Sequence, residues 1–212
     1  MTARRTWLLV ASYALLVPVG VLLLLAGPVA SEISFVGART SYAAYAGWAL
    51  RAAERRVPAR PREGEAAWLR FRGRVARLMA FDATAFLALC LSTRGSLGAG
   101  IAASWAGAGL LLVGVGIKRW AAASLAAGSY YWRDFFLPSR APRASVRGPY
   151  RWLSSPMYTL GYAHAYGFAL VAQSAPGLVG AAYAQALMLL LHALVERPHL
   201  ERLVRRQGAP SP

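Results

Sequence analysis

Acidic residues and cysteine are both scarce in this chain. Its 212 residues include 8 Asp and Glu against 24 Lys and Arg, which gives a formal net charge of +16. The only cysteine, Cys90, lies within an apolar segment. A single thiol can form neither a disulfide framework nor a cysteine metal site, so folds built on disulfides or on cysteine-bound metals are excluded.

Charge is also missing from several long stretches. Trp7–Gly27, Gly98–Ile117 and Pro176–Val195 contain no charged side chain, and each is near the roughly 20 residues that cross a bilayer. Met157–Ser174 is a fourth apolar run, with His164 as its only basic residue. A soluble protein of this length could not bury four such segments, so the sequence predicts an integral membrane protein. The first run exceeds the roughly 7–15 residues usual for a signal peptide, which favours a retained span.

Two weaker segments decide the number of crossings. Ile33–Leu50 is moderately apolar and contains Arg39, and Leu78–Ser92 is short and contains Asp82. If both cross the membrane, the protein has six spans and both termini lie on the same side. If Ile33–Leu50 instead lies along the interface, five spans remain and the N-terminus changes sides. The expected fold is therefore an all-α polytopic membrane protein with five or six transmembrane helices.

The basic residues are distributed unevenly between the loops. Under the six-span arrangement, the loops on one side together contain a single basic residue, Arg94. The opposite side receives nine arginines between Arg51 and Arg77, five from Arg133 to Arg151, and the C-terminal cluster. This asymmetry predicts that both termini are cytoplasmic. The charge then reflects topology and attraction to anionic lipids, not to nucleic acid, because no basic stretch alternates with stacking aromatics.

Composition and charge also bear on smaller features. The high alanine, arginine and glycine content hints at a bacterium with a GC-rich genome, which would place the protein in the inner (cytoplasmic) membrane.

Arg56–Glu65 is the one linker-like stretch. The following segment, AAWLRFRGRVARLM, combines aromatic residues with arginines. It suits an interfacial helix or a helix extension and, no less well, a solvated basic loop.

Polar residues concentrate at the expected cytoplasmic ends of the last three spans. The stretch KRWAAASLAAGSYYWRDFF is predicted to continue the preceding helix to Gly128. Pro156 is predicted to open the next helix, whose free N–H groups would suit a carboxylate or a phosphate. Glu196 lies near the end of the last span, where an ionisable residue is expensive. It is either functional, with a cationic partner, or it ends the helix as an ion pair with Arg151 or Arg197.

Two patterns in these spans have plainer explanations than the chemistry they suggest. Gly114 and Gly116 lie in an uncharged span, where close packing of helices explains them as well as contact with a cofactor does. His192, Glu196 and His199 fall near one helical face, but an intervening proline is predicted to break the register, and no fourth ligand is evident. No metal site is expected.

The C-terminal half resembles a family of membrane enzymes. The stretch GPYRWLSSPMYTLG, then a helical hairpin and VERPHLERL, is similar to the core shared by isoprenylcysteine carboxyl methyltransferases and phospholipid N-methyltransferases. The resemblance covers roughly Gly98 to Arg206, and the motifs GVG, SPMY, APGL and ERPHLERLVRRQ are nearer to the phosphatidylethanolamine branch. It divides the chain into N-terminal helices with a basic loop, 1–97, and a methyltransferase-like core, 98–208.

The resemblance implies a function and a set of site residues. It implies methyl transfer from S-adenosylmethionine to a lipid-soluble acceptor, with a phosphatidylethanolamine-type amine as the first choice. The alternatives are carboxyl or thiol methylation of an isoprenylcysteine or other small acceptor, and a non-catalytic membrane protein that kept the fold. The matching cofactor-binding positions are Gly114, Gly116, Gly148, Pro149, Tyr150, Ser155, Pro156, Met157, Tyr158, Glu196 and Arg197.

The sequence departs from the family pattern at two of those positions. Ser155 stands where the family has His or Asn, and Arg197 stands where it has a second acid. Both departures favour the non-catalytic alternative. The retained Gly-Pro-Tyr and Pro-Met-Tyr motifs, together with Glu196, favour an enzyme.

The chemistry of methyl transfer suggests roles for charged side chains. The Glu196 carboxylate can pair with the ammonium group of the cofactor or accept from its ribose hydroxyls, and Arg147 or Arg151 can meet its carboxylate. A lipid amine must also lose a proton, and Glu196 and His199 are the candidate bases. His164, in mid-span, is expected to be a hydrogen-bonded packing residue instead.

Aromatic side chains supply the remaining candidates. Tyr150, Trp152 and Tyr158 can face the sulfonium through cation–π contacts of roughly 0.5–2 kcal/mol each. Any one of these rings has an alternative explanation as part of an interfacial aromatic belt. With Glu196 and His199, Tyr158 completes the expected catalytic set.

Overall fold

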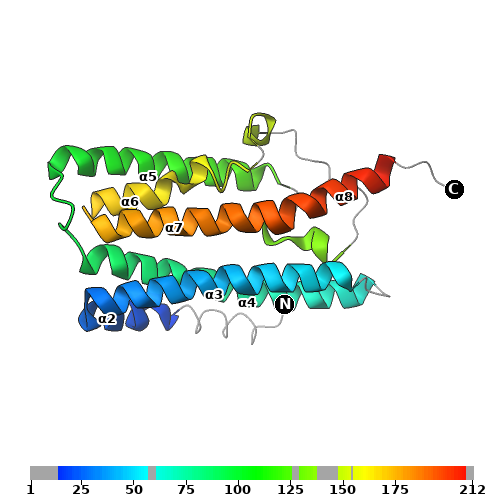
Figure 1. Cartoon of the computed structure of the whole chain (residues 1–212), viewed down its shortest axis with the longest axis horizontal. Coiled ribbons are helices and arrows are strands. Elements are labelled where there is room, and N and C mark those ends of the chain that lie inside the picture. Colours follow the sequence, from blue (N-terminus) through cyan, green and yellow to red (C-terminus); the bar gives the residue numbers. More distant parts are fainter. Residues whose placement is uncertain (1–13, 57–60, 126–128, 138–147, 154, 209–212) are drawn as a thin grey trace.

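The protein is a bundle of long helices, seen in a computed structural model that describes residues 14–56, 61–125, 129–137, 148–153 and 155–208. The helices are α2 (Leu16–Ala26), α3 (Pro28–Arg55), α4 (Pro61–Ser92), α5 (Gly100–Ala123), α6 (Ala163–Val171), α7 (Ala175–Leu191) and α8 (Arg197–Gly208). Short 3-10 turns lie between α5 and α6, and the described residues include no strand (Figure 1). The prediction of an all-α fold is confirmed.

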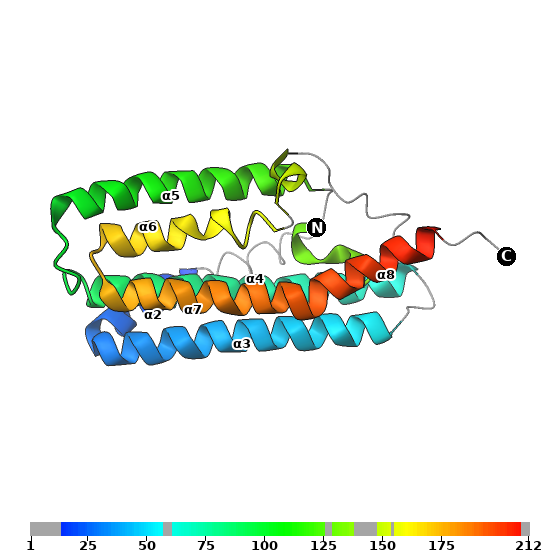
Figure 2. The same cartoon turned by 45° about the horizontal axis from the view of Figure 1, so that its top comes forward.

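The helices pack in two groups with α7 between them (Figure 1, Figure 2). One group contains α2, α3 and α4, and the other contains α5 and α6. Helix α7 contacts both groups, and its buried Ala181, Ala184 and Met188 join a core with Phe35 and Leu89. A site between the two groups therefore draws residues from both halves of the chain.

Three segments are long and apolar enough to cross a membrane: α4, α5 and the continuous stretch Ala175–Leu203. Helix α2 is a shorter apolar helix, and residues 7–13 of the first apolar run lie outside the described residues. Large apolar side chains are exposed on the outer surface, among them Trp105 at 73% and Leu112 at 74%. Such a surface suits hydrocarbon better than water and supports the predicted integral membrane protein.

The weaker apolar segments are parts of longer helices. Ile33–Leu50 lies within α3, which has 28 residues, and Leu78–Ser92 is the second half of α4, which has 32. The arginine-rich residues 66–79 form earlier turns of α4, so they extend a helix and are not a basic loop. The fourth run, Met157–Ser174, contains only a 9-residue helix, α6, which follows a turn and a short 3-10 segment.

The connection between α5 and α6 differs from its prediction. Helix α5 ends at Ala123, before the predicted end at Gly128, and residues 126–128 lie outside the described residues. Pro156 does not open a helix, because residues 156–159 form a turn and α6 begins only at Ala163. The reason is local: Thr159 has a ψ of −100°, which is outside the helical region and prevents a continuous α-helix.

The end of the last long helix also differs from its prediction. Pro198 does not interrupt it, because α7 passes through a π-helical turn, His192–Glu196, directly into α8. Proline lacks the N–H that would continue an α-helical ladder, and a wider turn just before it tolerates that loss. The prediction that Pro198 breaks the helix is therefore wrong, and the rotation of the helix changes in the π-helical turn instead.

The loops that are poor in basic residues, with Arg94 as their single one, meet at one end of the bundle. The amides of Gly95 and Leu97, between α4 and α5, donate to the carbonyls of Ala172 and Gln173, between α6 and α7. The junction of α2 and α3 at Gly27 lies at the same end (Figure 1). The arginine-rich start of α4 lies at the opposite end. The bundle is thus polarised along its long axis, as the charge distribution requires.

Glycines allow α5 and α6 to approach closely. A Cβ at Gly114 would lie 2.1 Å from the backbone nitrogen of His164, and one at Gly107 would lie 2.7 Å from the carbonyl oxygen of Gly167. Contacts this short leave no room for any side chain. Small residues at helix interfaces are the usual device for close packing in membranes.

We expect Gly114→Ala to lower the free energy of unfolding of the detergent-solubilised protein by about 1–3 kcal/mol, because the added methyl must push α6 away. The melting temperature should fall accordingly. Gly109→Ala on the same helix is the matched control, since nothing lies within 4 Å of its added Cβ. The control should keep or slightly raise stability, because alanine is the better helix former. Equal melting temperatures for both variants would contradict the close-packing explanation.

Candidate active site

Glu196 lies in a cluster of hydrogen-bond donors from three parts of the chain. Its Oε1 accepts from Trp132 Nε1 at 2.7 Å and from the Tyr158 hydroxyl at 2.8 Å. Its Oε2 lies 3.0 Å from His192 Nδ1, and the side chain is 12% exposed. Because an ionised carboxylate accepts about four hydrogen bonds, these contacts leave capacity for a further donor at Oε2.

Trp132 reaches this carboxylate from an unusual backbone conformation. Its φ of 51° and ψ of 40° are in the left-handed region, which is rare for a bulky residue and costs about 1–3 kcal/mol. The ring packs edge-on against Phe71 of α4, with centroids 6.0 Å apart. Arg133, the next residue, is fixed to Glu65 of α4 by a 2.8 Å ion pair. The packing against α4 thus maintains the strain that aims the indole N–H at Glu196.

The π-helical turn sets His192 and Glu196 on one face. Such turns are frequent at functional sites, because they displace a side chain from its α-helical position. The edge of the His192 ring also meets the Tyr158 ring, with centroids 5.8 Å apart. The sequence suggested His192 only as a metal ligand, yet it belongs to the Glu196 cluster. The described residues contain no group of three His, Cys, Asp or Glu side chains that could hold a metal ion.

Tyr158 and Tyr150 flank the cluster from the connection before α6. The Gln185 side chain of α7 fixes Tyr158 by donating from Nε2 to its carbonyl at 3.0 Å. Burial, and then the negative charge of Glu196, raise the pKa of Tyr150 to about 12. Tyr150 therefore stays protonated at neutral pH, as a neutral ring within the field of the carboxylate.

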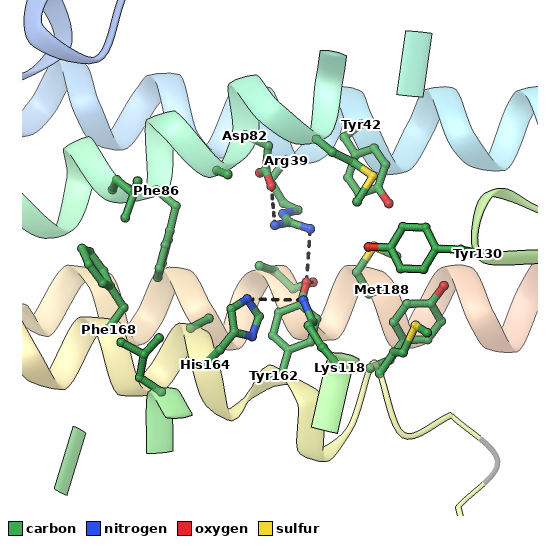
Figure 3. A pocket seen from close by; sticks show the side chains of 18 of the residues that line it. Arg39, Tyr42, Asp82, Phe86, Lys118, Tyr130, Tyr162, His164, Phe168 and Met188 are labelled. Atoms are coloured by element: carbon green, nitrogen blue, oxygen red, sulfur yellow. Dashed lines mark hydrogen bonds and ion pairs between the residues drawn. The ribbon is translucent and has the colours of Figure 1, made fainter. Parts of the chain in front are cut away.

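A cavity of about 320 Å³, here named the central cavity, lies beside this cluster between the two groups of helices (Figure 3). Trp132 and Tyr158 line it and also bind Glu196. Its other aromatic and sulfur-containing lining residues are Tyr42, Met79, Phe86, Tyr130, Met157, Tyr162, Phe168 and Met188. The cavity is therefore mostly apolar, with the carboxylate cluster at its edge.

Five side chains cross the middle of the cavity and are here named the polar layer: Arg39, Asp82, Lys118, Tyr162 and His164 (Figure 3). Arg39 donates from Nη2 to Asp82 Oδ2 and from Nη1 to the Tyr162 hydroxyl at 3.2 Å. Lys118 Nζ lies 3.3 Å from His164 Nε2 and 5.2 Å from the centre of the Tyr162 ring. Within the described residues Asp82 Oδ1 and Arg39 Nε have no hydrogen-bond partner, so this ion pair does not satisfy all of its buried atoms there.

The sequence carried a signal for part of the polar layer. Arg39 and Asp82 are charges inside otherwise apolar segments, and such residues are functional by default. Their pairing across α3 and α4 was not foreseen. Trp132 and Tyr130 gave no comparable signal, because only the packing of the connecting segment brings them to the cavity.

The predicted glycine and proline positions fall in different places. Gly148, with a φ of +61°, has no room for a Cβ beside Ser124 Oγ, so the turn that includes the buried Pro149 docks on the end of α5. Gly114 contacts α6, whereas Gly116 is exposed and a Cβ there would meet nothing within 4 Å. Pro156 is buried and is the first residue of the turn that precedes α6.

Other predicted positions are spread over the connection. Met157 lines the central cavity. Ser155 is 7% exposed, and its carbonyl accepts the amides of the turn. Trp152 is 70% exposed and contacts Trp120, away from the cavity, while Arg147 lies outside the described residues.

Two predicted residues lie away from the cluster. Arg197 faces outward, with its side chain 72% exposed, and pairs with Glu201 at 2.9 Å, so the expected ion pair with Glu196 is replaced. His199 is stacked on Phe135 at 3.7 Å between ring centres, and its Nδ1 lies 2.8 Å from Glu54 Oε1. His199 thus connects α8 to α3 and the connecting segment.

These features define a membrane protein with a carboxylate cluster and a polar layer around a cavity between its helices. Residues 102–207, half of the chain, match the phospholipid methyltransferase family. The chain belongs to the phospholipid methyltransferase family, and the resemblance stated from the sequence is confirmed. No solved structure matches the chain.

The chain is also similar to curated enzymes named phosphatidylethanolamine N-methyltransferase. It is 34% identical over 103 residues to the enzyme of Meyerozyma guilliermondii, 40% over 78 to that of Schizosaccharomyces pombe and 36% over 105 to that of Phaeosphaeria nodorum. These matches cover 48%, 36% and 48% of this chain, but 12%, 9% and 11% of the relatives. The chain thus matches only about a tenth of the length of these relatives.

We expect Glu54→Gln to loosen α8 at neutral pH, because Glu54 also accepts hydrogen bonds from Arg202. Burial alone would raise the pKa of Glu54, but the hydrogen bonds from His199 and Arg202 outweigh it and hold the pKa below the ordinary 4.5. A depressed carboxyl pKa stabilises the fold above about pH 4.5, and this stabilisation is lost as the pH falls through the folded value.

Thermal unfolding at pH 7 and below pH 4.5 tests this expectation. The melting temperature of Glu54→Gln should fall below that of the wild type at pH 7, and the difference should shrink in acid. Glu32→Gln, an exposed position on the same helix, is the control and should match the wild type at both pH values. A pH-independent difference would contradict the role given to the Glu54 carboxylate.

Proposed function

We propose that the protein transfers methyl groups from S-adenosylmethionine to the amine of a phosphatidylethanolamine-type lipid. The observation that carries this proposal is the place of Glu196, whose carboxylate is held by Trp132 and Tyr158, two rings that line the central cavity. A carboxylate beside aromatic rings attracts cations, and the methyl donor and the amine end of the zwitterionic lipid headgroup both carry a positive charge. Family membership and the names of the fungal relatives support the same reaction.

The residues around the cavity fit the methyl donor. Glu196 has acceptor capacity left at Oε2 for an ammonium group or a ribose hydroxyl. The cavity volume, about 320 Å³, lies at the lower end of the range of about 300–1,000 Å³ that is typical of ligand sites. When bound, the donor would supply a methyl carbon on a positively charged sulfur; the lone pair of an amine nitrogen can attack that carbon, and the sulfur leaves as a neutral thioether.

The other tasks fall to the protein's own side chains. A lipid ammonium must lose a proton before it can attack, and of the two predicted bases only Glu196 adjoins the cavity, since His199 is engaged with Glu54. His192 holds the second oxygen of that carboxylate and orients it. Displacement at a methyl group needs alignment of donor and acceptor above all, and the rings of Trp132 and Tyr158 limit the positions available to both.

The two departures from the family pattern weigh little against catalysis. Arg197 occupies the outer face of the helix, so its side chain leaves the Glu196 cluster intact. Ser155 contributes its carbonyl to the turn that carries Tyr158, and any residue can supply a carbonyl. These observations favour an enzyme over a non-catalytic protein of the same fold, and the names of the relatives favour a lipid amine over an isoprenylcysteine.

We propose the six-span topology, with both termini in the cytoplasm and Glu196 near the cytoplasmic face. The arginine-rich end of the bundle and the basic-poor loops at the other end support it. The proposed division into N-terminal helices, 1–97, and a methyltransferase core, 98–208, is supported by the family match over 102–207. A bacterial inner membrane is the proposed location.

We expect Glu196→Gln to weaken the binding of S-adenosylhomocysteine by about 10- to 100-fold, because it removes the charge from a buried carboxylate. Isothermal titration calorimetry of the detergent-solubilised protein measures this. Glu201→Gln, which changes an exposed acid one turn further along, is the matched control and should bind like the wild type. Equal affinity in Glu196→Gln and the wild type would refute the role of Glu196 in cofactor binding.

We expect expression in a bacterial host that makes phosphatidylethanolamine but no methylated derivatives to yield mono-, di- or trimethylated headgroups. Mass spectrometry of extracted lipids checks this, with Glu196→Gln as the inactive control. Absence of methylated lipids, despite measured cofactor binding by the same preparation, would exclude this acceptor.

A further inference from the structure

The central cavity changes its chemistry along the axis of the bundle (Figure 3). Phe86 and Phe168 lie on one side of the polar layer, and Tyr42 and Met188 lie on the other. Helix geometry agrees, because Phe86 on α4 is one turn beyond Asp82, toward the loops that are poor in basic residues. The cavity therefore runs from an apolar end through a charged middle to an aromatic end beside Glu196.

The charged middle holds more positive than negative charge. Among the residues that line the cavity, Arg39 and Lys118 are cationic and Asp82 is the one carboxylate. His164 is neutral in this arrangement, because its Nδ1 donates to the Gly161 carbonyl at 2.6 Å and its Nε2 accepts from Lys118. Asp82 is already paired with Arg39, so one positive charge, that of Lys118, lacks a carboxylate partner in the described lining.

Lys118 is also equipped to bind a ligand. An ammonium group carries three protons, and one contact, to His164 Nε2, engages one of them in the described part of the chain. Lys118 is partly buried, and a cation withdrawn from water without a counter-charge is costly, so an anionic oxygen at this point would be stabilising. Lysine is an established partner of phosphate groups as a point charge.

We propose, on the basis of the proposed function, that Lys118 binds the phosphodiester of the lipid acceptor, with Arg39 beside it. A phosphodiester carries one negative charge and balances the excess of the polar layer. Its acyl chains then extend past Phe86 and Phe168 toward the middle of the membrane, and its amine points toward Trp132 and Glu196.

This orientation agrees with the polarity of the whole bundle. The aromatic end of the cavity faces the arginine-rich end of the helices, where headgroups of the cytoplasmic leaflet would lie. The carboxylate of the methyl donor is the competing anion, but that molecule has no hydrocarbon chain to occupy the space between Phe86 and Phe168. The order apolar, cationic, then aromatic and acidic is the order of a phospholipid with an amine headgroup.

Lys118→Met in the full-length, detergent-solubilised protein tests the proposal, since methionine keeps most of the side-chain volume. Arg119→Met is the matched control, because Arg119 is the next residue along the helix, is also cationic, and is exposed outside the cavity. Arg39 is a poorer choice, as its loss would leave Asp82 buried and unpaired. Three ligands are titrated: dioctanoyl phosphatidylethanolamine, a long-chain primary amine without phosphate, and S-adenosylhomocysteine.

We expect Lys118→Met to weaken binding of the phospholipid by about 10- to 100-fold. Its affinities for the other two ligands should stay within about twofold of the wild-type values. Lys118→Arg should restore most of the affinity, and Arg119→Met should bind all three like the wild type. Unchanged phospholipid affinity in Lys118→Met would overturn the proposal, as would an equal loss for the phosphate-free amine. Weakened S-adenosylhomocysteine binding would instead assign Lys118 to the carboxylate of the cofactor.

The same titrations separate this proposal from the proposed function. If the wild type binds the phospholipid in a Lys118-dependent way but not S-adenosylhomocysteine, the lipid site stands and the methyltransferase function fails. If the wild type binds S-adenosylhomocysteine and methylates lipid, while Lys118→Met shows the same KM for phospholipid, the function stands and the lipid-site proposal fails.

Discussion

The buried carboxylate of Glu196 is the constraint on which the arrangement of the C-terminal half depends. A charge in an apolar bundle must be hydrogen-bonded, and its donors come from 64, 38 and 4 residues away along the chain. Satisfying them holds the strained Trp132, the turn of Tyr158 and the π-helical turn of His192 in a single geometry. Two of these rings, Trp132 and Tyr158, also line the cavity. The hydrogen bonds that satisfy the carboxylate therefore also hold the wall of the site in place.

A second charged group, the polar layer, divides the cavity into regions of different chemistry. In the part of the chain that the structure describes, the Arg39–Asp82 pair leaves Arg39 Nε and Asp82 Oδ1 without hydrogen-bond partners, so it is not the most stable way to fill this space. Apolar side chains of similar size would avoid that cost. Charges at this depth are expensive, which agrees with the proposed role in ligand binding; that role would connect the N-terminal helices to the family core.

The close contact of α5 with α6 brings these parts within reach of one another. Gly114 lets the backbone of α5 touch His164, and one turn along α5 Lys118 then contacts the same histidine. The structure thus gives Gly114 a packing contact with α6, and its role in cofactor binding stays a prediction. Its influence on the cavity is indirect, through the distance that it allows between two helices.

The amino-acid sequence by itself determined the all-α membrane fold and the family core, because long uncharged runs reveal the apolar solvent and local motifs reveal the family. It also singled out Glu196 as a candidate site residue. It could not determine the partners of these residues. His199 meets Glu54, 145 residues away, and Arg197 turns outward, because the π-helical turn changes the rotation of the last helix. The tertiary structure alone brought Arg39 to Asp82, Trp132 to Glu196 and Lys118 to the cavity, because such contacts arise from the packing of helices distant in sequence.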